Sequence, residues 1–326
     1  MPQLLGKVLG STGYGLMGLT WRPNPQPINE SIRAMKASIE VGNIFWNASL
    51  WSYAPAGEFY GTPEYNSLHL LNKYFTQYPE DASKVVLSVK GALRYGGPDG
   101  SPENIKRSVE NCLKLLDGKK SIDIFEPARL DRSTPLETTL RALEEYVKAG
   151  KIGGIALSEV SAATIQRAAK VTKIVAVEVE LSLWSLDILN NGVAAVCAEH
   201  DLLVVAYSPI GRGMLTGEVQ KLEDIPQGSY LGRSPRCQPG NFEKNLDLVR
   251  KLQDIASKKG CTPAQLAISW VRHLSKKNGN PEIIPIPGAT TPERIRENAK
   301  DVGLTGSDLE AIDSILKNFT VHGGRW

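Results

Sequence analysis

Short apolar runs alternate with amphipathic stretches along the whole chain. Between residues 28 and 41, for example, Ile32, Met35 and Ile39 recur at the spacing of one helical face, and Gly42 ends the pattern. Similar periodicity predicts helices over residues 28–41, 65–78, 102–116, 136–149, 162–169, 188–200, 242–259, 263–275, 291–300 and 307–316. The apolar runs predict strands over residues 13–19, 44–46, 85–89, 122–125, 154–157, 175–179, 203–206 and 282–286.

These strands are apolar on both faces, and each is followed by helix. Such strands are typical of a parallel sheet that helices cover on both sides. Eight of them favour an α/β fold of the (β/α)8 TIM-barrel type, and a length of 326 residues suits one such domain spanning residues 1–326. A Gly-x-Gly-x-x-Gly pattern at 13–18 also suggests a Rossmann fold, but the acidic residue expected about 20 positions later would fall inside helix 28–41.

Composition excludes several classes of partner. The chain has 38 basic and 35 acidic residues, a formal charge of +3, and no basic block that would bind nucleic acid or a membrane surface. Cys112, Cys197, Cys237 and Cys261 lie far apart and show no metal-ligand spacing. We therefore expect neither metal nor disulfide and a reducing, cytoplasmic location. No stretch reads as a signal peptide or a membrane span, and the sequence leaves the oligomeric state open.

Motifs at the ends of four predicted strands resemble those of the aldo-keto reductases. They are Gly15-Leu16-Met17-Gly18, the segment 150–158, the segment 206–213, and the segment 284–291 with Arg294, Glu297 and Asn298 behind it. More narrowly, the segments 45–47, 57–61, 126–129 and 157–160 look like the fungal pyridoxal reductase branch. That branch resembles enzymes that reduce pyridoxal to pyridoxine with NADPH.

Reduction of a carbonyl by hydride transfer needs a proton donor whose pKa is brought toward neutrality. The resemblance implies that Tyr60, in Gly-Glu-Phe-Tyr-Gly, is this acid and that the ammonium group of Lys90 lowers the pKa of its phenol. Asn47, at the end of the second strand, completes the predicted catalytic group. Tyr53 is a rival donor, because its distance from Asn47 is nearer to the family's spacing.

Three departures from the family pattern bear on this chemistry. Asn47 stands where an aspartate is usual, so we expect the charge of Lys90 to be less neutralised, and Ala128 stands where a histidine is usual. The loop before Tyr60 is also longer than the family's. Strand parity puts Glu126 on the same face as Ala128, and Arg129 reaches the pocket only if the strand ends there.

The resemblance also implies an NADP(H) site. Tyr207 would stack on the nicotinamide, and Ser158 and Glu178 would bind its carboxamide, although Glu178 replaces the usual glutamine. Backbone and guanidinium groups of 208–212 suit the pyrophosphate; the residues are Ser208, Pro209, Ile210 and Arg212. The adenosine phosphate would contact Gly288, Thr290, Thr291, Arg294, Glu297 and Asn298. A full charge from Arg294 favours NADP over NAD.

The leading hypothesis is therefore NADPH-dependent reduction of a small-molecule aldehyde or ketone, with pyridoxal-like substrates suggested. A reductase acting on another carbonyl in a specific pathway is one alternative. A catalytically impaired, NADP(H)-binding regulatory protein is another, because Asn47, Ala128 and the long loop all depart from the family pattern.

Overall fold

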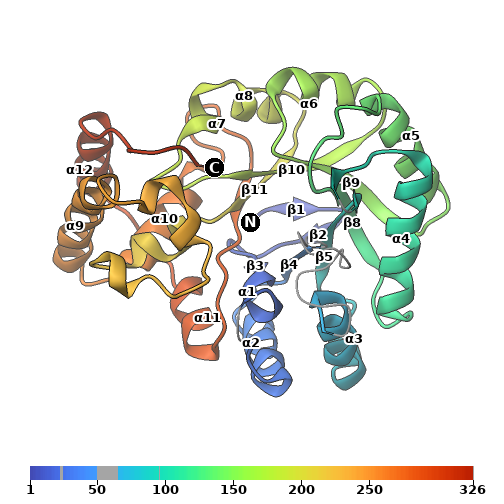
Figure 1. Cartoon of the computed structure of the whole chain (residues 1–326), viewed down its shortest axis with the longest axis horizontal. Helices are drawn as coiled ribbons and strands as arrows, with labels where there is room; N and C mark the ends of the chain where they lie inside the picture. The colour runs from blue at the N-terminus through green and yellow to red at the C-terminus, as the bar shows by residue number, and fades with distance from the viewer. Residues whose placement is uncertain (23–24, 50–64, 95, 326) are drawn as a thin grey trace.

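Eight parallel strands form the centre of the molecule, with helices around them (Figure 1). The computed structural model describes residues 1–22, 25–49, 65–94 and 96–325. In order around the sheet the strands are β3 (Tyr14–Gly15), β4 (Phe45–Ser49), β5 (Val86–Gly91), β8 (Ile122–Pro127), β9 (Ile152–Ser158), β10 (Ile174–Glu180), β11 (Leu203–Tyr207) and β12 (Ile283–Pro285). Strands that are neighbours in sequence are neighbours in space, which confirms the predicted (β/α)8 architecture.

The first and last strands meet and close the barrel. Gly15 pairs with Gly288 in a parallel bridge, and the amide of Gly13 donates to the carbonyl of Pro285 at 2.9 Å. A Cβ atom on Gly15 would lie 2.9 Å from the carbonyl oxygen of Ile286. Gly13 and Gly15 therefore allow the close approach of backbones at the barrel seam.

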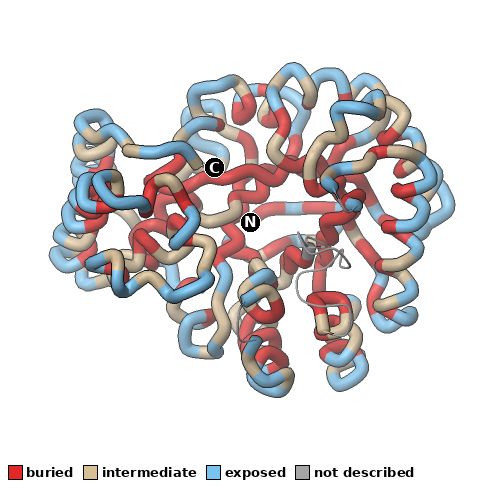
Figure 2. The backbone as a smooth tube through the Cα atoms, viewed as in Figure 1, coloured by how far each residue is buried: buried red, intermediate tan, exposed pale blue. Residues whose placement is uncertain are grey.

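The helices follow the predicted order and pack their apolar faces on the strands, so that buried residues face inward and exposed residues face outward (Figure 2). Side chains cap the amino-terminal ends of several helices; the Ser101 hydroxyl, for instance, accepts a hydrogen bond from the backbone amide of Asn104. The helices are α1 (Met17–Thr20), α2 (Ile28–Glu40), α3 (Ser67–Gln77), α4 (Pro102–Leu116), α5 (Leu136–Lys148), α6 (Ala162–Ala169), α7 (Asp187–Asn190), α8 (Val193–Glu199), α9 (Phe242–Lys259), α10 (Pro263–Leu274), α11 (Pro292–Ala299) and α12 (Gly306–Lys317).

Two predicted elements differ from the structure. The strand predicted over 13–19 contains only β3, and its second half turns into helix α1. The helix predicted over 188–200 is divided into α7 and α8, because Gly192 has φ of 87°, a left-handed conformation that a continuous helix cannot contain.

An antiparallel hairpin of β1 (Gln3–Leu4) and β2 (Lys7–Val8) covers the amino-terminal end of the barrel. Lys7 Nζ donates to the carbonyl of Val85 and to Asp123, both at the beginnings of strands. The opposite, carboxyl end is therefore the end that side chains of a site can reach.

A second hairpin and several short helices lie in the connections between the main helices and strands. A second hairpin pairs β6 (Leu93–Arg94) with β7 (Gly97–Pro98), and η1 (Pro79–Asp81) follows α3. The segment 211–241 contains η2 (Gly211–Thr216), η3 (Leu222–Asp224), η4 (Leu231–Arg233) and η5 (Pro235–Cys237).

Alternation along each strand divides the core into two parts. One apolar cluster lies between the strands and the helices, and a smaller one fills the barrel interior. The interior cluster includes Phe45, Val86, Ile124, Ala176 and Val205. Because side chains alternate along a strand, residues two or four positions further along point into the same interior, nearer its carboxyl end.

Candidate active site

Polar side chains form a layer on top of the apolar barrel interior. Asn47 follows Phe45 by two positions, Lys90 follows Val86 by four, Glu126 follows Ile124 by two, and Glu178 follows Ala176 by two. Each thus shares the inward face of its strand. All four are at most 6% exposed.

Lys90 lies between two carboxylates. Its ammonium group donates a short hydrogen bond to Glu178 Oε1 and lies 3.8 Å from Glu126 Oε1. Asn47 Nδ2 donates to Glu178 Oε2 at 2.6 Å and, more weakly, to Glu126 Oε1 at 3.5 Å. The expectation that the charge of Lys90 is less neutralised because position 47 carries an amide is therefore wrong, since Glu178 supplies a carboxylate.

The buried position of Glu126 affects its protonation. Burial raises the pKa of Glu126 well above its ordinary value, and the neighbouring carboxylate of Glu178 raises it further, against the opposing charge of Lys90. One ammonium cannot neutralise two buried carboxylates, so the arrangement favours a proton on Glu126 and an ion pair between Lys90 and Glu178.

A cavity of about 570 Å³ opens above this layer. It runs from Lys90, Asn47 and Glu178 to the start of α11, and it is the cavity into which the carboxyl ends of the strands point. In the described part of the chain its wall is formed by Gly15, Met17, Gly18, Trp21, Asn47, Lys90, Ala128, Arg129, Glu178, Tyr207, Ser208, Pro209, Ile210, Arg212, Gly213, Thr216, Glu218, Val219, Pro226, Ser229, Tyr230, Leu231, Ala264, Ile286, Gly288, Ala289, Thr290, Arg294 and Asn298. The segment 211–241 thus contributes one side of the cavity.

The two candidate proton donors, Tyr60 and Tyr53, lie outside the described residues. Their assignment remains a prediction from the sequence. Lys90, the predicted partner of Tyr60, lines the cavity. The Lys90 amine also lies 5.6 Å from the centre of the Tyr207 ring.

The end of β8 carries no histidine. Ala128 is buried and lines the cavity, and β8 ends at Pro127, so Arg129 also reaches the cavity, as the sequence allowed. The Arg129 guanidinium donates to the carbonyl of Ala128 at 2.6 Å and to the Ser158 hydroxyl at 3.4 Å. Ser158 is itself 1% exposed and absent from the cavity wall.

The residues expected beside the pyrophosphate line the cavity after β11. Ser208 and Arg212 have positive φ values of 52° and 59°, so the chain turns sharply there. The Arg212 guanidinium pairs with Glu180 at 3.1 Å and stacks on the ring of Tyr230 at 4.0 Å. The pKa of Tyr207 is raised by burial and by the carboxylates of Glu159 and Glu180.

The far end of the cavity carries the predicted adenosine-phosphate residues. Gly288, Thr290, Arg294 and Asn298 line it, whereas Thr291 and Glu297 do not. The Thr291 hydroxyl caps α11 by accepting from the amide of Arg294 at 3.3 Å. Arg294 pairs with Glu297 at 2.8 Å and forms a short ion pair with Glu218 of the 211–241 segment.

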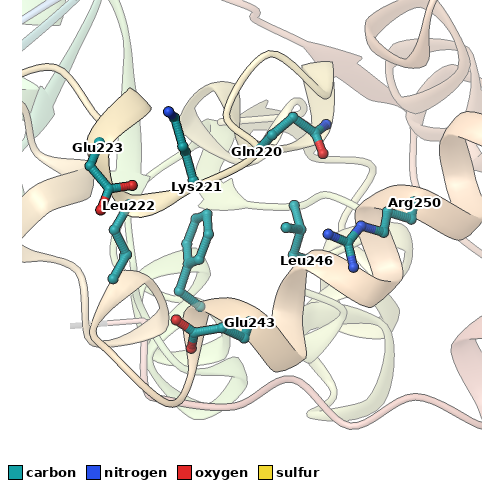
Figure 3. A pocket seen from close by; sticks show the side chains of 8 residues that line it. Gln220, Lys221, Leu222, Glu223, Glu243, Leu246 and Arg250 are labelled. Carbon is teal, nitrogen blue, oxygen red and sulfur yellow. The ribbon is translucent and has the colours of Figure 1, made fainter.

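A second hollow, of about 310 Å³, lies between η3 and α9 (Figure 3). Its lining mixes Lys221 and Arg250 with Glu223 and Glu243 around Phe242 and Leu246. Acids and bases lie interspersed there. All four of these charged side chains are exposed, unlike the buried charges of the barrel interior.

Several contacts within the site were not foreseen from the sequence. The contacts of Glu126 and Glu178 with Lys90 and of Glu218 with Arg294 join segments far apart in the chain. Strand parity was the available signal for the first two, since it aligned Glu126 with the inward face. Within the described ranges, no cluster of three or more His, Cys, Asp or Glu side chains could hold a metal ion. Over the same ranges, no helix has the length and apolarity needed to cross a membrane.

Comparison with known proteins agrees with this geometry. The family model described as "Aldo/keto reductase family" matches residues 12–317. A protein of Schizosaccharomyces pombe named "Probable pyridoxal reductase 2" is 38% identical, over 100% of this chain and 97% of its own. Another from that yeast, "Aldo-keto reductase yakc [NADP(+)]", is 33% identical over 96% of this chain and 90% of its own.

Among solved structures, the glycerol dehydrogenase of Gluconobacter oxydans superimposes with a TM-score of 0.80 at 21% identity, covering 97% of this chain and 94% of that one. At this identity the likeness concerns the fold alone. The family match over most of the chain, together with relatives similar over nearly their whole length, establishes the family. The protein belongs to the aldo-keto reductases.

Proposed function

We propose that this protein reduces an aldehyde or ketone to an alcohol with NADPH, and that a pyridoxal-like aldehyde is its substrate. The observation that carries the proposal is the buried Lys90–Glu178 ion pair, which lies at the carboxyl end of the barrel directly beneath a large cavity. Buried charged groups at this end of a barrel are typical of a reaction centre.

The cavity suits a nicotinamide cofactor carrying a 2′-phosphate. Near Lys90 its wall includes the aromatic ring of Tyr207, and at its far end it includes the guanidinium of Arg294 and the amide of Asn298. When bound, NADPH supplies the hydride for the substrate carbonyl. The name of the S. pombe relative that includes NADP(+) also supports the phosphorylated cofactor.

The chain's own residues would supply the proton and hold the substrate. In this proposal the Tyr60 hydroxyl donates its proton to the carbonyl oxygen, and the ammonium group of Lys90 lowers the pKa of that phenol. Ala128 leaves room in the cavity wall, and the Arg129 guanidinium beside it offers donors to a polar substrate. The name of the relative that is 38% identical supports pyridoxal as the first substrate to test.

Purified protein should oxidise NADPH when pyridoxal is added, and Tyr60→Phe should abolish this turnover while NADPH still binds. Tyr53→Phe is the matched control, because the rival phenol lies in the same loop. Loss of turnover in Tyr53→Phe with normal turnover in Tyr60→Phe would reverse the assignment. Turnover with other carbonyls but not pyridoxal would favour the pathway-specific alternative.

A regulatory, NADP(H)-binding protein remains the second candidate, because Ala128 replaces the histidine that the family resemblance implies. In the same assay this second candidate predicts tight NADPH binding with no turnover of any carbonyl substrate. We also propose a reducing, cytoplasmic location, which the four free cysteines support.

A further inference from the structure

We propose that Glu178 is a positioning residue for Lys90, and that Asn47 is the amide that holds Glu178 in place. This inference rests on the proposed reductase function for its catalytic consequence, but the pairing itself can be tested without substrate. It gives Glu178 a different task from the carboxamide contact that the family resemblance implies.

The contacts of Glu178 divide its two oxygens between two partners. Oε1 accepts from the ammonium group of Lys90, and Oε2 accepts from Asn47 Nδ2 at 2.6 Å. A carboxylate offers acceptors only, so it matches a lysine and an amide donor at the same time. The side chain of Glu178 is 4% exposed, and both bonds therefore form away from bulk water.

The three side chains come from separate strands, β4, β5 and β10, and all point into the barrel interior. Among the described residues, the other charged or titratable groups near Lys90 include Glu126 on β8, with its nearest oxygen 3.8 Å away, and Tyr207 on β11. Arg129, after β8, acts on Glu126 through its charge. Glu126 is farther from the lysine than Glu178, and burial favours its neutral form.

Of the carboxylates in the described part of the chain, Glu178 is thus the one that pairs most closely with Lys90. An ammonium that is neutralised lowers the pKa of a neighbouring phenol less than a bare ammonium does. Glu178 therefore sets how strongly Lys90 acts on the proton donor. It also fixes the lysine's position, because its other oxygen is anchored across the barrel by Asn47.

The amide and the carboxylate can exchange places without losing their hydrogen bond. An aspartate at 47 would accept from a glutamine at 178, and the layer would still contain one carboxylate and one amide facing the lysine. The single change Asn47→Asp instead puts a further carboxylate into this buried layer, against Glu178 and Glu126. The double variant therefore tests whether the paired amide and carboxylate matter, independently of which residue is present at 47 or at 178.

The first experiment compares Glu178→Gln, Asn47→Asp and the double variant in steady-state turnover across pH. We expect Glu178→Gln to lower kcat by about 10²-fold, within the range that a positioned acid contributes, with KM for NADPH little changed. The alkaline limb of its kcat–pH profile should move to lower pH, because the ammonium group of Lys90, without the Glu178 carboxylate, lowers the pKa of the phenol further. The double variant should recover most of the loss, whereas Asn47→Asp alone should not match the wild type.

A carboxamide role for Glu178 gives the opposite result, because glutamine adds a donor: NADPH would bind more tightly to Glu178→Gln and the pH profile would stay in place. That outcome overturns the proposal. Asp81→Asn is the matched control, since Asp81 is a buried, lysine-paired carboxylate outside the barrel interior. It should lower stability and leave the pH profile unmoved.

The second experiment needs no turnover and so distinguishes failure of this inference from failure of the proposed function. Urea unfolding is measured for Lys90→Met, Glu178→Gln and the double variant. Lys90→Met leaves the buried Glu178 carboxylate without its ammonium partner, and Glu178→Gln leaves the Lys90 ammonium without this carboxylate. If the two residues pair, the double variant should therefore be less destabilised than the sum of the two single variants. Additive effects would show that Glu178 does not pair with Lys90 and would overturn the proposal.

Discussion

The protonation of Glu126 has a measurable effect on stability. The side chain is 1% exposed and lies 3.8 Å from the Lys90 amine. The variant Glu126→Gln keeps the shape of a protonated glutamate, and its amide oxygen can still accept from Asn47. If Glu126 is neutral in the native protein, the substitution should change the free energy of unfolding by less than about 1 kcal/mol near pH 5. If it is ionised, the change removes half of a buried ion pair and should cost about 3–5 kcal/mol.

The two cases also differ in pH dependence. Burial, followed by the charge of Glu178, raises the folded pKa of Glu126 above its ordinary value of 4.5. Below that value both the folded and the unfolded chain hold the proton. As the pH rises above it, the unfolded chain releases the proton while the folded chain keeps it. The wild type then loses about 1.4 kcal/mol per pH unit from this group until the folded pKa is passed.

Glutamine does not titrate, so the stability of Glu126→Gln relative to wild type should increase as the pH rises above the ordinary glutamate pKa. Urea unfolding at a series of pH values measures the difference directly. The control is Glu180→Gln, a buried glutamate on β10 that pairs with Arg212, which should lose stability. A loss of several kcal/mol in Glu126→Gln at every pH, with no relative gain as the pH rises, would refute the neutral state of Glu126.

Three further variants test other parts of the structure. Glu218→Gln removes a carboxylate that pairs with Arg294, so NADPH binding followed by fluorescence should strengthen by up to about fivefold, a small effect because the pair is exposed. Asp81→Asn should cost about 2 kcal/mol in urea unfolding at neutral pH. Burial alone would raise the pKa of Asp81, but hydrogen bonds from two lysines and a tyrosine lower it, so this stability is present above the unfolded pKa and is lost as the pH falls. Gly91→Ala puts a Cβ atom 2.4 Å from the Phe125 ring and should lower stability by about 1–3 kcal/mol.

Each of these variants has a matched control. For Glu218→Gln the control variant is Glu223→Gln, which removes an exposed acid of η3. NADH, which lacks the 2′-phosphate, is titrated in parallel with NADPH. Tighter binding of NADH by Glu218→Gln would contradict a role of Arg294 at the 2′-phosphate. Asp254→Asn lies on the exposed face of α9 and should leave the acid limb of stability unchanged. Gly306→Ala meets no atom within 4 Å, so equal losses in it and Gly91→Ala would contradict the steric account.

The sequence predicted the architecture well because the relevant signals are local. Buried parallel strands need uniformly apolar runs, and helices that cover them need an apolar stripe, so both periods are visible in the chain. The starts of α4, α6, α9 and α10 agree with the prediction. The errors fall where a backbone conformation overrides the pattern, as at Gly192, whose positive φ divides a helix that is otherwise continuous in its periodicity.

The candidate site was only partly predictable. Lys90, Asn47, Tyr207 and Arg294 were identified because each follows a strand end or begins a helix within a motif. Ser158, Thr291 and Glu297 were expected to face the cofactor, but the cavity wall does not include them. A motif specifies which residue is present, whereas the neighbours that bury or engage its side chain come from other parts of the chain.

The sequence by itself determined the barrel, the family resemblance and the presence of an amide at 47 and a carboxylate at 178. It presented these last two as separate departures, because they lie 131 positions apart. Only the tertiary structure brought them into one hydrogen bond and placed Lys90 beside Glu178 and Glu126. The physical reason is that closure of the barrel turns the inward faces of distant strands toward one another, and the charge balance in that buried layer belongs to the group rather than to any single position.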